Sequence, residues 1–242
     1  MEQNQAIVHK KGQATLLMIL GVFLILGIGV FFFWDNVDVY ISEEIGRSEE
    51  EKDQYETLQE CLSYYTEQGL KKIEAQGGYI TLGRDAIQVY NESIGIFSQE
   101  GEQKVSLEDI EKDLADYIAM QTKENCFQES NKYEIDKLED PKAEAEFLSD
   151  SLVLTMDWPL RFRSKENPTE IFTISTAAEE IQTHFMSLFE VAEVVSQNEG
   201  NIDYQQEYFS NQEVNLTLFS YEEQTIVLLG KEEEFFIIAI GN

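Results

Sequence analysis

The chain has 242 residues, of which 47 are Asp or Glu and 17 are Lys or Arg, giving a net charge of −30 at pH 7. Binding to nucleic acid or to anionic lipid heads needs a basic face, so this composition argues against both. The chain is nevertheless rich in Tyr, Phe, Ile and Leu beyond position 34, so we expect that part to fold around an apolar core.

A run without charged residues extends from Ala14 to Trp34. As a helix it would be about 31 Å long, enough to cross the roughly 30 Å hydrocarbon core of a bilayer. It is apolar all round, whereas a helix in a soluble protein keeps polar residues on one side. A secretory signal has a shorter apolar region that ends at a small-residue cleavage site, and this run ends in FFFWD. We therefore expect a membrane helix within residues 13–34.

The charges that flank this run predict its orientation. Lys10 and Lys11 precede it, whereas Asp35 and Asp38 follow it. Because Lys and Arg accumulate on the cytoplasmic side of a membrane helix, residues 1–12 are expected inside the cell and the C-terminal domain outside. The sequence thus predicts a single-pass protein of the cell membrane, in contact with membrane lipid.

The stretch Lys10–Gln13 (KKGQ), followed by the apolar run, resembles the processing site of archaeal type IV pilins and archaellins. The resemblance covers residues 9–34. In that family a prepilin peptidase cuts after the glycine, and the apolar helix then packs into the core of a filament. The resemblance therefore implies cleavage between Gly12 and Gln13. It also implies two kinds of partner, a prepilin-peptidase-type protease and other pilin-like subunits.

Two features of the sequence depart from the pilin pattern. Leu17 stands where bacterial pilins have an acidic residue, although archaeal members often lack that residue. Residues 35–42 alternate apolar and polar side chains, which indicates an extended segment rather than a continuing helix. The alternative is a plain single-pass anchor that carries a monomeric extracellular binding or receptor module and does not polymerise.

Two cysteines, Cys61 and Cys126, are the only ones in the chain. Since an extracellular compartment permits disulfides, we expect these two to be bonded to each other. Two cysteines without a C-x-x-C motif, together with only two histidines, do not make a tetrahedral zinc site. We therefore expect no metal and no cofactor.

The first half of the C-terminal domain is expected to hold two helices. One spans about residues 48–75, capped by Ser48 and ended by Gly77-Gly78. The other begins at Ser106 and ends just before Cys126. Between them, the stretches YITL, AIQVYN and IGIFS predict a small sheet. Residues 129–147 are rich in charges, which is typical of a loop or a domain boundary.

The second half begins with a predicted strand at SLVLTMDWPLRF, in which Pro159 indicates an edge or a bulge. A return strand, EIFTIST, follows it. A third helix is expected over 175–195, capped by Ser175 or Thr176. Three strands joined by short turns, EVNLTLFSY, TIVLLGK and EEFFIIAIG, predict an antiparallel meander at the end of the chain.

These elements define an α+β fold, in which one N-terminal transmembrane helix precedes a mixed domain of helices and antiparallel sheet. We expect four parts. They are a basic cytoplasmic leader at 1–12, a transmembrane or filament-core helix at 13–34, a first helix-plus-strand part at 35–147 and a second α+β part at 148–242.

No residue pattern in the chain names a reaction. The motifs of serine hydrolases, zinc proteases and nucleotide-binding loops do not occur. His184 is the one histidine beyond the apolar run, and we expect it to lie on the third helix in a structural role. Asn91 and Asn215 open N-x-[ST] triplets and are candidate glycosylation sites. We expect no catalytic residue and a non-enzymatic protein at the cell surface.

Overall fold

The computed structural model describes residues 48–83, 86–100, 102–127, 130–197 and 213–241. The expected membrane helix and the Lys10–Gln13 site lie outside these residues. Within them, no helix has the length and apolar character needed to cross a membrane. Residues Asp53–Asn242 form one compact unit.

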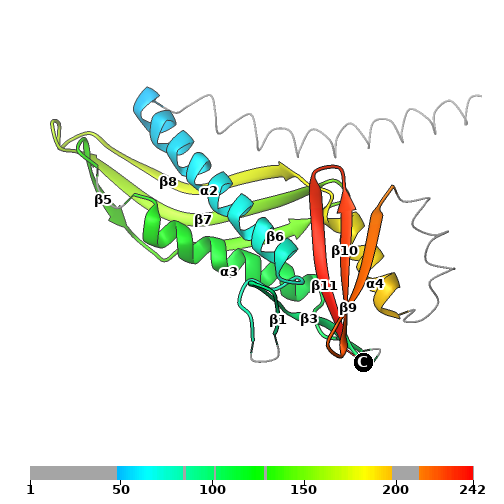
Figure 1. Cartoon of the computed structure of the whole chain (residues 1–242). Helices are drawn as coiled ribbons and strands as arrows, with labels where there is room; N and C mark the ends of the chain where they lie inside the picture. The colour runs from blue at the N-terminus through cyan, green and yellow to red at the C-terminus, as the bar shows by residue number, and fades with distance from the viewer. Residues whose placement is uncertain (1–47, 84–85, 101, 128–129, 198–212, 242) are drawn as a thin grey trace, which may run out of the picture. The chain divides into compact units, whose positions relative to one another are not determined.

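The described residues combine three helices with eleven strands, which confirms the α+β class (Figure 1). The sheets are mostly antiparallel, and the pair β3–β11 is parallel. The helices are α2 (Glu49–Ala75), α3 (Leu107–Asn125) and α4 (Phe185–Gln197). The strands are β1 (Ile87–Val89), β2 (Glu92–Ile94), β3 (Ile96–Gln99), β4 (Glu102–Gln103), β5 (Tyr133–Lys137), β6 (Lys142–Phe147), β7 (Ser151–Ser164), β8 (Ile171–Gln182), β9 (Asn215–Tyr221), β10 (Gln224–Lys231) and β11 (Glu234–Gly241).

The long strand β7 organises a four-stranded sheet. On one side, β8 pairs with almost the whole length of β7. On the other side, β6 pairs with the first half of β7 and β5 with the second half. The register between β7 and β8 shifts between Asp157 and Leu160, next to Pro159. Because proline has no N–H to donate, it suits such a bulge, as the sequence predicted. One face of β7 is buried, through Leu152, Leu154, Met156, Trp158, Leu160 and Phe162.

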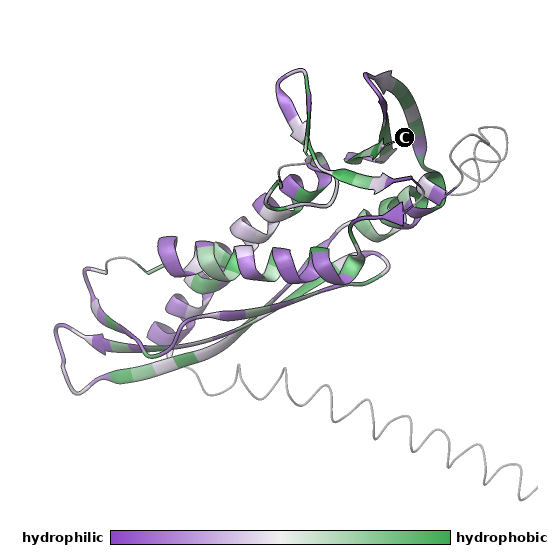
Figure 2. Ribbon diagram, turned by 90° about the horizontal axis from the view of Figure 1, so that it is seen from below, coloured by the Kyte–Doolittle hydropathy of each residue, from purple (hydrophilic) through white to green (hydrophobic). Residues whose placement is uncertain are grey.

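A second sheet has five strands in the order β4-β3-β11-β10-β9. The antiparallel meander β9–β10–β11 confirms the prediction for the end of the chain. β3 joins its edge from far away in sequence and lies parallel to β11. The hairpin β1–β2 packs on this sheet, where Val89 and Ile94 cluster with Ile226 and Ala239. Figure 2 shows how hydrophobic the C-terminal strands are.

The predicted small sheet of three neighbouring stretches is therefore wrong. Only β1 and β2 pair with each other, and residues 79–82 lie outside any strand. Tyr79 instead donates its hydroxyl to the Ile96 carbonyl, at 2.8 Å. Its ring lies so close to Gly95 that a side chain added there would meet it at 2.2 Å. The apolar character of this stretch thus reflects side-chain packing rather than strand pairing.

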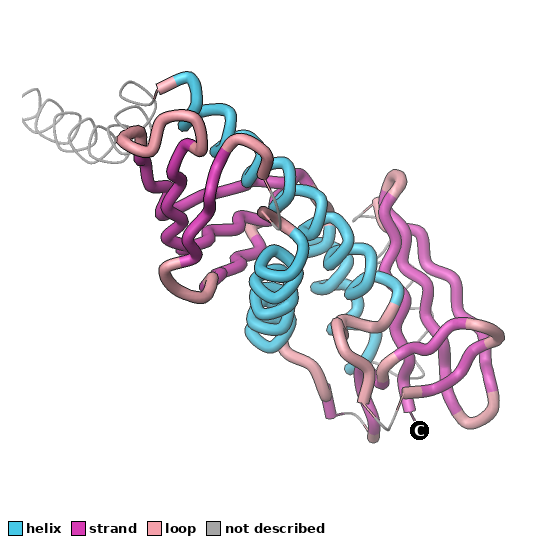
Figure 3. Tube along the Cα trace, turned by 90° about the vertical axis from the view of Figure 1, so that its left-hand side faces the viewer, coloured by secondary structure: helices cyan, strands magenta, loops and turns pink. Residues whose placement is uncertain are grey.

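Both larger sheets and all three helices contribute to one apolar core. Figure 3 shows the helices in the space between the strands of the two sheets. The ring of Phe185 on α4 lies 4.6 Å from that of Phe147 on β6 and 5.2 Å from that of Phe236 on β11. Phe185 therefore touches the four-stranded and the five-stranded sheet at once.

The ends of α2 follow the signals in its sequence. At its start, the Ser48 hydroxyl accepts a hydrogen bond from the Glu51 N–H at 3.2 Å. At its end, Gly77 takes a positive φ of 74°, and the Gly78 N–H bonds back to the Ile73 carbonyl at 2.8 Å. This is the glycine-dependent closure expected after a helix. The predicted helix at 48–75 is confirmed.

The predicted second helix is also confirmed as α3, with a capping box between Ser106 and Asp109. α2 and α3 pack closely at Gly69, where an added Cβ would meet the Leu114 side chain at 2.4 Å. Cys61 on α2 is bonded to Cys126 at the C-cap of α3, with a Cα–Cα distance of 6.3 Å. The predicted disulfide is present.

Residues 129–147 are not a loop, contrary to the sequence-based expectation, because they contain β5 and β6. Tyr133 and Phe147 are buried, and the alanines of β6 are half-buried between exposed charged residues. Strands whose outer face is charged are well suited to a sheet edge. The high density of charge in this segment belongs to that outer face.

The predicted helix over 175–195 is only half right. Residues up to Gln182 continue β8, and helix α4 begins at Phe185. Alanine and glutamate favour helix, but here Thr176–Gln182 pair with β7 from Asp157 back to Ser151. Ala177 is buried in that pairing, at 1% exposed. Long-range pairing therefore overrides the local preference.

Breaking the disulfide should destabilise the fold substantially. Cys61 and Cys126 are 65 residues apart, and a loop of that size corresponds to about 4 kcal/mol in the chain-entropy estimate. The double variant Cys61→Ser/Cys126→Ser is expected to lose stability of that order in urea unfolding. As a control, a reductant should lower the stability of the wild type and leave the variant unchanged. Equal stabilities of the two proteins would contradict this role.

Replacing Glu222 with glycine should stabilise the protein. Glu222 is the first residue of the two-residue turn between β9 and β10, and its φ is 54°. A residue with a Cβ pays about 1 kcal/mol in this conformation, and glycine does not. We expect Glu222→Gly to raise the free energy of unfolding by up to about 1 kcal/mol. The matched variant Glu223→Gly, at a position without positive φ, should bring no gain, and an equal gain would contradict the strain at Glu222.

Candidate functional site

The end of β11 that faces α4 carries a carboxylate which caps that helix. Glu234 accepts a hydrogen bond from the His184 N–H at 2.6 Å and another from the Thr183 hydroxyl at 2.9 Å. The Thr183 hydroxyl in turn accepts from the Phe185 N–H at 3.1 Å. A negative charge at a helix N-terminus is favourable, because the unpaired N–H groups and the helix dipole both attract it.

A second carboxyl group, on Glu74 near the end of α2, is buried close to this cap. Glu74 as a whole is only 7% exposed to solvent. Burial raises the pKa of Glu74 from 4.5 to about 8, with the nearby Glu234 charge adding to the rise and Lys71 opposing it. At neutral pH Glu74 is therefore mainly protonated. The pair resembles the arrangement in which two neighbouring carboxyls avoid ionising together.

His184 lies just before α4, not within it as the sequence suggested. Its Nε2 is 3.3 Å from a carboxylate oxygen of Glu232, in the turn before β11. Its Nδ1 is buried and has no hydrogen-bond partner among the described residues. The described residues contain no group of three or more potential metal ligands. We assign this acidic centre, formed by Glu74, Glu234 and His184, a structural role.

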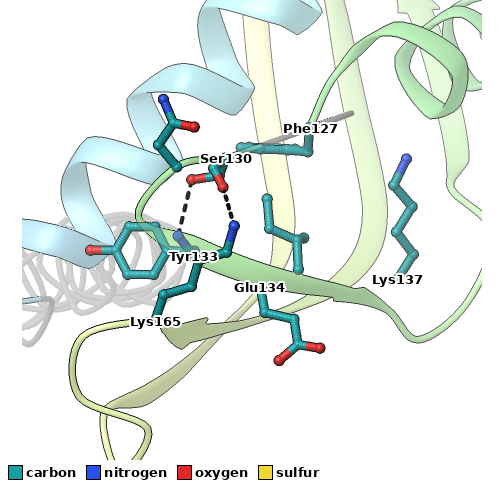
Figure 4. A pocket seen from close by; sticks show the side chains of 8 residues that line it. Phe127, Ser130, Tyr133, Glu134, Lys137 and Lys165 are labelled. Atoms are coloured by element: carbon teal, nitrogen blue, oxygen red, sulfur yellow. Dashed lines mark hydrogen bonds between the residues drawn. The ribbon is translucent and has the colours of Figure 1, made fainter.

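An open pocket of about 600 Å³ lies beside β5, at the end of the four-stranded sheet (Figure 4). The Ser130 hydroxyl accepts from the Tyr133 N–H at 3.1 Å and so fixes the turn into β5. The lining combines an apolar wall with polar groups. It consists of Phe127, Ser130, Asn131, Tyr133, Glu134, Ile135, Lys137 and Lys165.

Two lysines in this pocket are held in place by neutral acceptors. The Lys165 ammonium donates to the Ser130 carbonyl at 2.7 Å. The Lys137 ammonium donates to the Lys123 carbonyl at 3.0 Å and lies 5.3 Å from the centre of the Trp158 ring. Neither ammonium forms an ion pair with a carboxylate in the part of the chain that the structure describes.

Among the described residues that line the pocket, the one carboxylate is already paired with a cation. Glu134 lies 3.2 Å from a guanidinium nitrogen of Arg163 on the neighbouring strand. In Figure 4 its carboxylate points away from Ser130. The positive charges of Lys137 and Lys165 therefore remain available to a ligand.

The charge around this pocket differs from that of the whole chain. Residues 130–137 and 160–170 carry five cationic and four acidic side chains, a net charge of +1, whereas the chain carries −30. A negatively charged group can therefore approach this end of the sheet without net local repulsion. We call these two stretches the β5 tip.

A shallower groove of about 430 Å³ lies between α2 and β8. The Gln59 amide on α2 donates to the Ala178 carbonyl on β8 at 3.3 Å. Tyr64 is 57% exposed in this groove. Burial raises the pKa of Glu179, and a hydrogen bond from Ser63 partly opposes this rise. The groove is acidic, with Glu60, Glu67 and Glu179 in its lining.

The candidate glycosylation sites are both accessible. Asn91 lies in the turn between β1 and β2, Asn215 is the first residue of β9, and both are exposed.

The pocket lysines, Lys137 and Lys165, were not predicted from the sequence. The signal that identifies them, a locally balanced charge in a strongly acidic chain, becomes visible once β5 and β7 are known to be neighbours.

No known family model matches the chain, and the comparisons with curated proteins and with solved structures found no significant match.

Substituting Glu74 should change how stability depends on pH. The folded protein holds this proton up to about pH 8, whereas the unfolded chain releases it near pH 4.5, so the free energy of unfolding falls as pH rises between these values. Glu74→Gln removes that loss. We expect both proteins to be similar near pH 4.5 and the variant to be more stable at pH 8, at about 1.4 kcal/mol per unit of pKa shift.

Urea unfolding at three pH values across this window measures the effect. The matched control is Glu60→Gln, which alters an exposed glutamate on the same helix and should leave the pH profile unchanged. A stability difference between Glu74→Gln and wild type that does not vary with pH would contradict the buried, protonated carboxyl.

Proposed function

We propose that this chain is a non-enzymatic, membrane-anchored cell-surface protein that acts as a pilin-like subunit in structure, adhesion or assembly. The apolar run at 13–34 would serve as its anchor or filament-core helix. The cytoplasmic leader would end at Gly12, and the folded domain would face outward. Membrane lipid, a prepilin-peptidase-type protease and sister subunits would be its partners.

The observation that carries this proposal is the disulfide between Cys61 and Cys126. Disulfides persist in oxidising compartments and are rare in the cytosol. The bond therefore supports an extracytoplasmic location for the folded domain. The flanking charges around the apolar run support the same orientation independently.

The described side chains favour binding or assembly over catalysis. In the acidic centre, Glu234 caps α4 and Glu74 is buried. The pockets beside β5 and between α2 and β8 present charged groups and aromatic rings at the surface. Such surfaces suit contacts with another macromolecule.

A second candidate function is a monomeric, anchored binding module that never polymerises. The pocket beside β5 favours it, because two positioned lysines over an apolar wall form a ligand site on a single chain. The two candidates share the anchor and the orientation. They differ in whether the leader is removed and whether copies contact each other.

The mass of the N-terminal peptide, from protein purified out of its native membrane, separates the two. A pilin-like subunit should begin at Gln13 or its pyroglutamate form. Gly12→Val should leave the leader attached, because it adds a branched side chain at the cleavage position. Gly21→Val, inside the apolar run, serves as the control and should still be processed. A native chain that retains Lys10–Gly12 would exclude the pilin-like assignment and leave the monomeric module.

A further inference from the structure

We propose that the pocket beside β5 receives carboxylate side chains from a second copy of this chain. The inference deepens the proposed assembly function and rests on it. Its basis is the pair of ammonium groups on Lys137 and Lys165, each fixed by a backbone carbonyl and by no described carboxylate. Each ammonium has three donors and spends one of them, so two remain for a ligand.

The spacing of the lysines indicates a polymer with several acids. Lys165 bonds through its backbone to Lys132, at the start of β5, and Lys137 ends that strand. The backbone position on β5 next to Lys165 and that of Lys137 are thus four to five residues apart, which is roughly 13–16 Å at 3.3 Å per residue. The two ammonium groups are also held at different places, Lys165 at the Ser130 carbonyl and Lys137 at the Lys123 carbonyl, so each calls for its own carboxylate. Two acidic side chains on one polypeptide can supply both.

The charges of the chain make a sister copy the appropriate partner. The β5 tip carries +1 in a chain of −30, so the rest of the surface is rich in the groups that this pocket needs. At physiological salt, charges beyond about 8 Å are screened, and local complementarity decides the contact. The net repulsion between two copies is thereby reduced.

The same chain also carries a matching acidic surface. Glu60 and Glu67 line the groove between α2 and β8, two helical turns apart, and Glu67 is in an exposed pair with Lys71 at 3.6 Å that a second lysine can join. At 1.5 Å per residue, the separation of Glu60 and Glu67 along the helix is about 10.5 Å, a few ångströms less than the spacing along β5 given above, and the flexible lysine side chains can bridge that difference. Tyr64 stands between them and is 57% exposed. It adds apolar surface that the wall of the pocket can cover.

A contact between the β5 tip of one copy and a different surface of the next is heterologous. Such a contact leaves an unused tip on one copy and an unused groove on the other. Repetition therefore produces either a closed ring or an open, helical series of subunits. The second outcome is the one that a filament requires.

Zero-length carbodiimide cross-linking tests this contact, because it joins a lysine to a carboxylate only when the two touch. The full chain is purified in detergent with an excess of empty micelles, as an equal mixture of ¹⁵N-labelled and unlabelled molecules. We expect peptides in which Lys137 or Lys165 of one isotope is joined to an acid of the other. Their yield should fall several-fold between about 0.1 M and about 1 M salt, as the Debye length shrinks.

The variant Lys137→Gln/Lys165→Gln should lose these mixed-isotope products. The matched control is Lys104→Gln/Lys142→Gln, which removes two exposed lysines that pair with glutamates of their own chain, and it should retain them. Mixed products absent from the wild type, or equally abundant at Lys104 and Lys142, would overturn the proposal. So would binding of an acidic oligosaccharide that depends on Lys137 and Lys165 in a chain without mixed products.

These results are independent of the processing test. A chain cleaved before Gln13 that lacks mixed products would retain the pilin-like function and lose the tip contact. An uncleaved chain would remove the function on which the contact rests.

Discussion

The fold depends on one aromatic contact, the position of Phe185 between two sheets. Its ring touches Phe147 of the four-stranded sheet and Phe236 of the five-stranded sheet. Phe189, one turn further along α4, reaches Phe97 on β3 at 5.7 Å. Because α4 is short, its orientation must be fixed from outside. The Glu234 carboxylate does this from β11, by accepting the N–H group of His184 directly before Phe185. Aromatic packing and the charged cap therefore both fix the position of the N-terminal end of α4.

Much of this architecture is readable from the sequence, where signals are local. Ser48, Gly77 and Ser106 mark helix ends through hydrogen bonds to their own neighbours, and the C-terminal meander follows from short turns between apolar runs. The disulfide followed from a count of two cysteines.

Most of the failures involve strand pairing that local composition does not reveal. Residues 175–182 have helical composition, yet they pair with β7, and β3 joins β11 from more than a hundred residues away. β5 and β6 were hidden by charges that belong to one exposed face. The pocket lysines were missed for the same reason, since Lys137 and Lys165 become neighbours only through the pairing of β5 with β7. The raised pKa of Glu74 also arises from burial against a distant strand.

The bond between α2 and α3 has a mechanical consequence. A pull applied at the N-terminal end of α2 and resisted at the C-terminal strands reaches Cys61 and then crosses directly to Cys126. The residues between them carry no tension, since the covalent link bypasses them. With the bridge reduced, the same stretch, 65 positions along the chain, is free to extend. At about 3.4 Å per residue this would lengthen the tether by roughly 220 Å, so oxidation state sets the reach of the domain under load.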